Sequence, residues 1–120
     1  MTDASPGTSV QESVVIDVWD VPDGRQDEVI AALREVLERL RLVDGFVDGR
    51  ILASLDGTKV ISYSMMRSAA DRTLAVGQQD IRDGLQRLEA IAVPDRNTYD
   101  LSCVFTARPH GPTAVSPGAV

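Results

Sequence analysis

The sequence predicts an α+β domain of the ferredoxin-like β-α-β-β-α-β type with an antiparallel sheet, and three observations support this prediction. The chain has 120 residues, of which 43% are hydrophobic and 25% charged, and this composition is typical of a single globular domain. Short β-branched segments alternate with two longer segments whose apolar residues recur every three or four positions. An Asp-Gly pair separates the two middle strand-like segments, which is typical of a β-hairpin.

The first part of the chain predicts one strand and one helix. Residues 13–20 (SVVIDVWD) are rich in β-branched and aromatic side chains, and the Pro-Asp-Gly sequence at 22–24 ends this strand. Residues 25–42 are predicted to be a helix that ends at Asp44-Gly45, with acidic side chains in its first turn and arginines in its last, as the helix dipole favours. The apolar face of this helix consists of Val29, Ile30, Leu33, Val36, Leu37 and Leu40.

A hairpin follows the first helix. Residues 46–55 and 58–66 are predicted strands around Asp56-Gly57, which is a signal for a two-residue type I′ turn. This turn fixes the register of the two strands, because residues at equal distances from it face each other. The predicted cross-strand pairs are Ala53 with Val60, Ile51 with Ser62, and Arg50 with Tyr63.

The last part of the chain predicts a second helical segment and a final strand. The helical segment begins at Ser68 with a sequence similar to a capping box and continues to about Ala92. Gly77 is expected to kink or split this helix, and Pro94 to end it. Residues 98–107 (TYDLSCVFTA) then form the last strand.

The two ends of the chain differ in composition from the predicted domain at residues 13–107. Residues 1–12 and 108–120 contain mainly small, polar, proline and glycine residues, so we expect disordered tails. His110 lies in the second tail, where we expect it to be solvated. The first residues lack the basic and apolar stretches of a signal peptide, which predicts a cytoplasmic protein.

Charge and residue counts exclude several function classes. The net charge of −6 disfavours a nucleic-acid partner, and no apolar run approaches the length of about 20 residues that spans a bilayer. Cys103 and His110 are the single cysteine and the single histidine, so neither a disulfide within the chain nor a metal site rich in these ligands is expected. Cys103 has no basic or histidine neighbour in sequence, which favours a small apolar role over that of a nucleophile.

Strand alternation predicts which side chains share a face of the sheet. One face, which two helices can cover, receives the candidate site residues together with several apolar side chains: Val15, Asp17, Trp19, Ile51, Ala53, Leu55, Val60, Ser62, Ser64 and Met66. The opposite face receives mainly apolar side chains: Val14, Ile16, Val18, Leu52, Ile61 and Met65, with Arg50 and Tyr63 among them. An uncovered apolar face of this size predicts a homodimer joined sheet to sheet.

Two segments add a resemblance to a known family. The sequences Val43-Asp44-Gly45-Phe46 and Tyr63-Ser64-Met65-Met66-Arg67-Ser68, together with the Pro-Asp-Gly turn and the Asp-Gly hairpin, resemble the antibiotic biosynthesis monooxygenase family over residues 13–107. The resemblance implies a dimeric α/β barrel. Members of this family include cofactor-free anthrone oxygenases of aromatic polyketide pathways and haem-degrading enzymes, and related dimeric barrels include polyketide cyclases.

The chain departs from the family's site pattern at several positions. The anthrone oxygenases have an Asn-Tyr-x-x-Trp pattern in the third strand, and this chain has Ser62 in place of the Asn, keeps Tyr63, and has Met66 in place of the Trp. The haem degraders add an Asn in the first strand and a His in a helix. The matching first-strand position is Asp17, and residues 68–92 contain no histidine, so haem degradation is not expected.

Asp17 and Ser62 are the candidate catalytic residues. Asp17 interrupts an apolar strand on the face predicted to hold the pocket, where a buried carboxylate can act as a general base. The alternative is a salt-bridged or edge aspartate with a structural role. The Ser62 hydroxyl can hold a hydroxyl or carbonyl group of a substrate.

The candidate substrate-binding residues share the same pocket or its rim: Trp19, Ser64, Met66, Arg67 and Arg72. Trp19 can stack on a flat aromatic ligand, although core packing is an equally good interpretation. Ser64 and Met66 form a wall of mixed polarity, or a strand packed under a helix. Either arginine can hold a phenolate or a carboxylate, although arginines are more often surface residues.

Three function classes remain open. The first is a cofactor-free monooxygenase that deprotonates a phenolic or anthrone substrate, a small aromatic polyketide, so that its carbanion reacts with O₂ directly. The second is a polyketide cyclase that uses the same proton abstraction. The third is a non-catalytic auxiliary protein that binds a small molecule. We expect no metal and no bound cofactor, while reduced flavin supplied by another protein stays open.

Overall fold

A computed structural model describes residues 11–109, so the two predicted tails fall largely, and His110 entirely, outside the described residues. The element order confirms the predicted β-α-β-β-α-β fold, with the second helical segment divided in two. The elements are β1 (Ser13–Asp20), α1 (Gln26–Leu40), β2 (Phe46–Ala53), β3 (Lys59–Met66), α2 (Ala69–Val76), α3 (Gln79–Glu89) and β4 (Val93–Asp100). In this part of the chain, no helix has the length and hydropathy that crossing a membrane requires.

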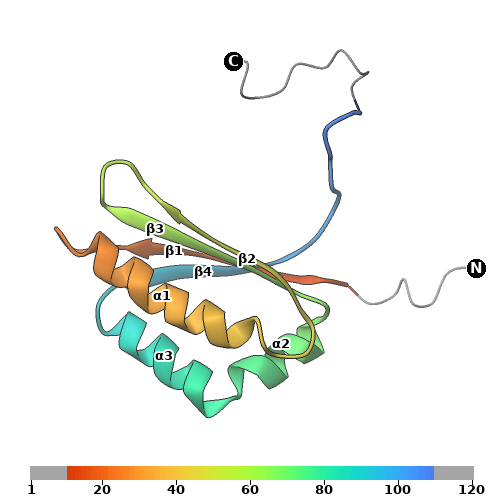
Figure 1. Cartoon of the computed structure of the whole chain (residues 1–120), viewed down its shortest axis with the longest axis horizontal. Coiled ribbons are helices and arrows are strands. Elements are labelled where there is room, and N and C mark those ends of the chain that lie inside the picture. The colour runs from red at the N-terminus through yellow and green to blue at the C-terminus, as the bar shows by residue number, and fades with distance from the viewer. Residues whose placement is uncertain (1–10, 110–120) are drawn as a thin grey trace, which may run out of the picture.

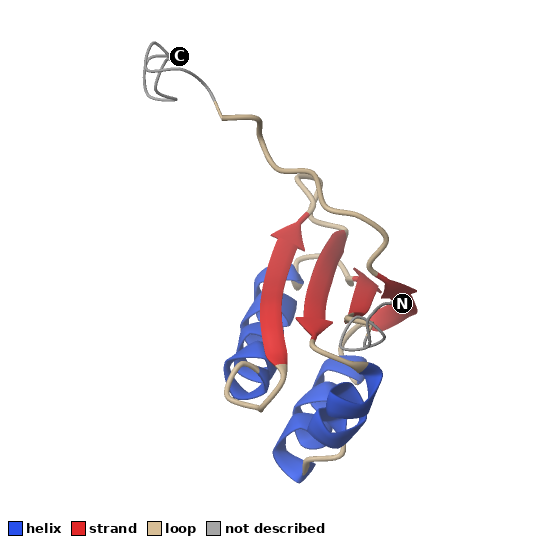
Figure 2. Cartoon of the chain, turned by 90° about the vertical axis from the view of Figure 1, so that its right-hand side faces the viewer, coloured by secondary structure: helices blue, strands red, loops and turns tan. Residues whose placement is uncertain are grey.

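The four strands form one antiparallel sheet in the order β2-β3-β1-β4. All three helices lie against the same face of this sheet (Figure 1). Within residues 11–109 no helix covers the opposite face, as the view in Figure 2 makes clear. The sheet therefore has a helix-covered face and an open face, and these two names are used below.

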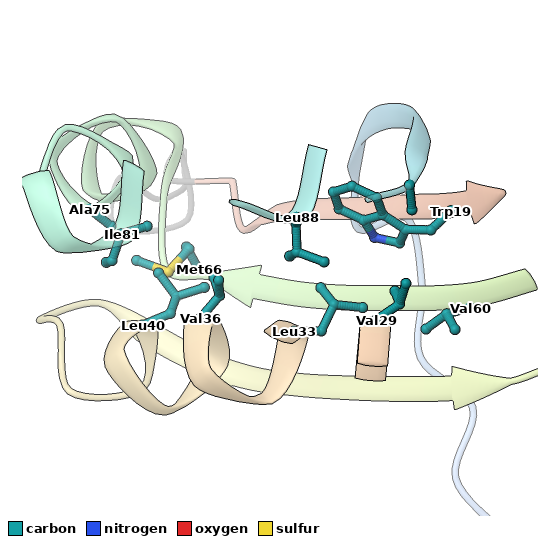
Figure 3. Packing of buried hydrophobic residues seen from close by; sticks show 11 residues of the cluster. Trp19, Val29, Leu33, Val36, Leu40, Val60, Met66, Ala75, Ile81 and Leu88 are labelled. Atoms are coloured by element: carbon teal, nitrogen blue, oxygen red, sulfur yellow. The ribbon is translucent and has the colours of Figure 1, made fainter. Parts of the chain in front are cut away.

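The hydrophobic core fills the space between the sheet and the helices. Helix α1 contributes four buried side chains from the predicted apolar stripe. The cluster seen in Figure 3 includes Trp19, Val29, Leu33, Val36, Leu40, Val60, Met66, Ala75, Ile81 and Leu88, and Ala92 completes it. These residues come from β1, β3 and all three helices, so the core joins both layers.

The hairpin has the predicted register but a different turn. Ala53 faces Val60 and Ile51 faces Ser62, as predicted. The Gly57 amide donates to the Ser54 carbonyl at 3.2 Å, so the tight turn spans residues 54–57 rather than two residues. The prediction of a two-residue type I′ turn is therefore wrong. The Asp56 carboxylate accepts hydrogen bonds from the Thr58 amide and hydroxyl, and these bonds favour the wider turn.

The second helical segment begins and breaks where the sequence predicts. The Ser68 hydroxyl accepts a hydrogen bond from the Asp71 amide at 3.1 Å and caps α2. Gly77 ends α2, and α3 begins two residues later at a changed direction. Helix α3 ends at Glu89, so the helical segment is shorter than predicted.

The predicted position of the last strand is wrong. Strand β4 covers Val93–Asp100, whereas residues 101–109 have no regular structure and extend away from the sheet (Figure 2). The partner strand explains this difference: Asp100 faces Ser13, the first residue of β1, so β4 has no neighbour to pair with beyond this point. Pro94 lies inside β4, which an edge strand tolerates. Cys103 is exposed and does not belong to the core.

Candidate functional site

A cavity of about 320 Å³ lies between the helix-covered face of the sheet and the helices. Its apolar wall comes mainly from α1 and α3, for example through Leu33, Val36 and Leu85. Its polar wall comes from the strands and α2 through Asp17, Ser62, Ser64, Arg72 and Arg96. A mainly apolar cavity with a few converging polar groups is typical of a site for a small molecule.

Asp17 is buried in the floor of this cavity, with 6% of its surface exposed. Its neighbours across the sheet are Ser62 on β3 and Arg96 on β4. The Asp17 Oδ1 atom accepts a hydrogen bond from Arg96 Nε at 2.8 Å. Within residues 11–109, no hydrogen-bond donor reaches the second oxygen, Oδ2. One carboxylate oxygen is thus held in place, and the other has no partner in the described part of the chain.

Ser62 is held by the tryptophan beneath it. The Trp19 indole Nε1 donates a hydrogen bond to Ser62 Oγ at 3.0 Å, and both side chains are buried. Because the hydroxyl oxygen accepts this bond, its own proton remains available to a ligand in the cavity. Trp19 therefore orients Ser62 from inside the core.

Arg72 spans the end of the cavity and ties α2 to the sheet. Its Nε donates to Ser13 Oγ at 2.8 Å and its Nη1 donates to Ser64 Oγ at 2.9 Å. Its Nη2 donates to the backbone carbonyls of Ser13 and Ser64 at 2.7 and 2.9 Å. Burial lowers the pKa of Arg72, and the charge of Asp17 opposes that shift only in part. The guanidinium nevertheless stays protonated, because arginine does not lose its proton in proteins.

Arg96 is the functional residue that the sequence analysis missed. Burial by itself lowers the pKa of Arg96, but the hydrogen bond and charge of Asp17, with a further contribution from Glu89, outweigh burial and raise it. Its guanidinium also lies 5.9 Å from the ring centroid of Trp19, which favours a cation–π contact. Arg96 is absent from the predicted site because the predicted last strand begins at residue 98. The signal that was available is the alternation of Pro94, Arg96 and Thr98.

The structure separates the predicted site residues into two groups. Asp17, Ser62, Ser64 and Arg72 line the cavity together. Trp19, Met66 and Arg67 do not line the cavity, contrary to the predicted placement.

These three residues have other surroundings. Trp19 and Met66 are fully buried in the core, since the helices pack directly on their ends of the strands. Arg67 is exposed and forms ion pairs with Asp71 at 2.9 Å and Asp44 at 3.4 Å. The arginine that lines the polar end of the cavity is therefore Arg72 and not Arg67.

A second hollow, of about 390 Å³, lies between α1 and the edge strand β2. Four of its five charged side chains form two ion pairs: Arg50 lies 3.2 Å from Asp48, and Arg41 lies 3.2 Å from Glu38. These four side chains are well exposed, and the fifth charged side chain of the groove, Arg34, is exposed as well, so the groove offers no dry charged site. Among the described residues, no group of three or more His, Cys, Asp or Glu side chains is arranged to hold a metal ion.

The comparisons with known proteins concern the fold. No protein-family model matches the sequence, and no curated protein matches it. Among solved structures, SnoaB, a cofactor-independent oxygenase from Streptomyces nogalater, is similar with a TM-score of 0.68 and 17% identity, over 86% of this chain and 99% of that protein.

Two further structures are similar at low sequence identity. A candidate antibiotic biosynthesis monooxygenase from Nitrosomonas europaea has a TM-score of 0.67 and 16% identity, over 78% of this chain and 91% of its own. A conserved protein of unknown function from Bacteroides thetaiotaomicron has a TM-score of 0.72 and 9% identity, over 76% and 98%. These matches confirm the predicted resemblance at the level of the fold: the chain has the α+β architecture of SnoaB and of antibiotic biosynthesis monooxygenase-like proteins.

Proposed function

We propose that this protein is a metal-free oxygenase that oxidises a small aromatic substrate with O₂ in the cavity under the helices. The observation that carries the proposal is Asp17, a buried carboxylate in an apolar-walled cavity with Oδ1 fixed by Arg96 and Oδ2 facing no described donor. A carboxylate in this setting can accept a proton from a substrate bound against it. The fold shared with a cofactor-independent oxygenase supports the proposal by analogy.

The nature of Asp17 restricts the substrate. Carboxylates are weak bases, so the proton must come from an acidified C–H or O–H group, as in an anthrone or a phenol. The Ser62 hydroxyl lies on the neighbouring strand, directly across from Asp17, and can donate to the oxygen that becomes negative as the proton leaves. The apolar side chains of α1 and α3 keep water away from the resulting carbanion.

The overall reaction is balanced for anthrone as the substrate. Asp17 takes one proton from the methylene carbon, and the carbanion gives electrons to O₂, so that a C–O bond forms. The O–O bond then breaks as the second C–H proton is lost. The carbon is oxidised to a carbonyl, one oxygen atom enters the quinone, and the other leaves as water.

A homodimer is the assembly that we propose for this enzyme, with the open faces of two sheets in contact as in a dimeric α/β barrel. Val18, Ile61 and Leu52 form an apolar row across three strands on the open face, and Leu52 is 53% exposed in the single chain. The segment at residues 101–109 adds Phe105, which is 91% exposed. A second copy would remove this apolar surface from water.

Oxygen uptake with anthrone tests the proposed function. The protein, treated with EDTA, is expected to consume one O₂ per anthrone, and ¹⁸O₂ should place one labelled atom in the quinone. Heat-denatured protein measures the background of spontaneous oxidation. Uptake no faster than this background with anthrone and with hydroxylated anthrones would contradict an oxygenase. Ring closure of a polyketide chain without O₂ uptake would favour a cyclase, and binding without turnover would favour an auxiliary protein.

A further inference from the structure

We infer that the cavity selects ligands that carry a carboxylate, and that Arg72 together with the Ser64 hydroxyl recognises this group. The inference rests on the proposed function only in that both place the ligand in this cavity. It adds a substrate class, aromatic acids, to the reaction proposed above.

The charged side chains that line the cavity do not balance. Two guanidinium groups, those of Arg72 and Arg96, line it together with one carboxylate, that of Asp17. Arg96 is paired with Asp17 at 2.8 Å and lies 3.7 Å from Glu89. Within residues 11–109, no carboxylate lies within 4 Å of Arg72. The cavity thus contains an excess positive charge inside a protein whose net charge is −6.

Among the described residues, Arg72 and Ser64 each keep a hydrogen-bond donor that has no acceptor. A guanidinium has five N–H groups, and the four hydrogen bonds of Arg72 go to neutral oxygens of Ser13 and Ser64. One N–H group on Nη1 is left. Ser64 Oγ accepts from Arg72, so its hydroxyl proton is also free to donate. The available groups at this end of the cavity are therefore donors beside a positive charge, and they match an anionic oxygen.

These donors are already held in position. Arg72 is fixed between β1 and β3 by bonds to both strands, so a ligand does not have to order this long side chain. Preorganisation of this kind reduces the entropic cost of binding. Burial of the guanidinium, which lowers the pKa of Arg72, also strengthens its attraction for a ligand carboxylate. Arg67 has neither property, because it is exposed and already paired with Asp71.

The test compares two planar probes of almost equal shape, 2-naphthoate and 2-naphthamide, by titration calorimetry at neutral pH. The wild-type protein should bind the carboxylate at least about tenfold more tightly than the amide, which is the usual contribution of one charge-assisted hydrogen bond. Arg72→Gln should reduce naphthoate affinity to that of the amide and leave the amide nearly unchanged. Arg67→Gln, the matched control, should keep the preference.

Several outcomes would overturn the inference. Equal binding of the two probes by the wild type would overturn the inference. This result does not depend on the Arg72→Gln variant, which could be destabilised because it loses the hydrogen bonds that join α2 to the sheet. Loss of the preference in Arg67→Gln but not in Arg72→Gln would show that Arg67, and not Arg72, binds the carboxylate. If anthrone is oxidised while naphthoate has no advantage, the carboxylate inference fails and the oxygenase proposal stands. If neither probe binds and anthrone is not oxidised, both fail.

Discussion

The helix-covered and open faces of the sheet use alternate residues of the same strands, and around the cavity their chemistry is the reverse of what burial usually favours. On β3 the covered face has Ser62 and Ser64 before it reaches Met66, whereas the open face has Ile61 and Met65. In this part of the sheet polar groups thus lie beneath the helices and apolar groups face outward, whereas Trp19, Val60 and Met66 keep the rest of the covered face apolar. Hydroxyl groups that line a cavity beneath helices are suited to binding a small molecule. Exposed apolar residues are suited to binding a protein. The two faces therefore predict different kinds of partner.

The largest expected effect concerns the open face. Ile61 lies between Val18 and Leu52, so Ile61→Asp would place an unpaired carboxylate from each chain in the centre of the proposed dimer interface. We expect the dissociation constant to rise at least about 1000-fold, because each buried charge without a partner costs several kcal/mol. Sedimentation equilibrium measures this change.

A matched substitution on a helix separates the dimer from general effects of charge. Leu74 on α2 is 71% exposed, and Leu74→Asp should leave the wild-type assembly unchanged. If wild type and Ile61→Asp sediment alike, either as monomers or as dimers, the interpretation of the open face is wrong.

Truncation of leucine compares the stability of the two faces directly. Leu88 on α3 is completely buried between the helices and the covered face, so Leu88→Ala should lower the free energy of unfolding by about 2–5 kcal/mol. Leu52→Ala on the open face, measured in the monomeric Ile61→Asp background, should cost about 0.5 kcal/mol or less. Urea denaturation measures both values, and equal losses would remove the distinction between the faces.

Ser62→Ala gives a smaller effect on the covered face. The substitution leaves Trp19 Nε1 without its acceptor inside the core, which should cost about 1–3 kcal/mol of folding stability. Tyr63→Phe removes a hydroxyl from the neighbouring residue on the open face and should cost about 0.5 kcal/mol or less. Chemical denaturation followed by Trp19 fluorescence compares the two variants, and a neutral Ser62→Ala would argue against the indole–hydroxyl bond.

The smallest effect lies outside both faces, in the hairpin turn. Hydrogen bonds from the Thr58 amide, the Thr58 hydroxyl and the Ser54 hydroxyl lower the pKa of Asp56 to about 2. Because this pKa is lowered on folding, the stabilisation is complete above about pH 4 and is lost as the pH falls through 2. The carboxyl carbon of Asp56 should titrate by NMR with a midpoint near 2, whereas a midpoint near 4 would show that the turn does not hold this carboxylate.

Strand alternation explains how much of the site was predictable. It placed Ser62 and Ser64 on one face because the Asp-Gly hairpin fixed the register of β2 and β3, and it placed Asp17 on the same face as Val15 and Trp19. It could not tell a cavity from a packed core. Trp19 and Met66 share this face with the cavity residues but lie where the helices pack directly on the sheet. Alternation predicts the face of a residue, whereas depth depends on how the helices cover that face.

The last strand shows a second limit of prediction. Residues 101–107 have more β-branched and aromatic character than the polar stretch around Arg96, yet Arg96 belongs to β4 and residues 101–107 to no strand. The eight residues of β1 fix the extent of β4, since every one of them has a partner on it. Tertiary pairing thus outweighs local propensity at this edge, and the error removed Arg96 from the predicted site.

The most direct test of the account is the turnover of Asp17→Asn with anthrone in the presence of EDTA. The amide keeps the shape of Asp17 but cannot accept the proton, so oxygen uptake should fall by about 10²–10⁴-fold while the dimer and the fold persist. Asp20→Asn, at the end of the same strand and paired with Lys59 outside the cavity, should retain wild-type turnover. A folded Asp17→Asn variant that consumes oxygen at the wild-type rate would contradict the assignment of Asp17 as the base.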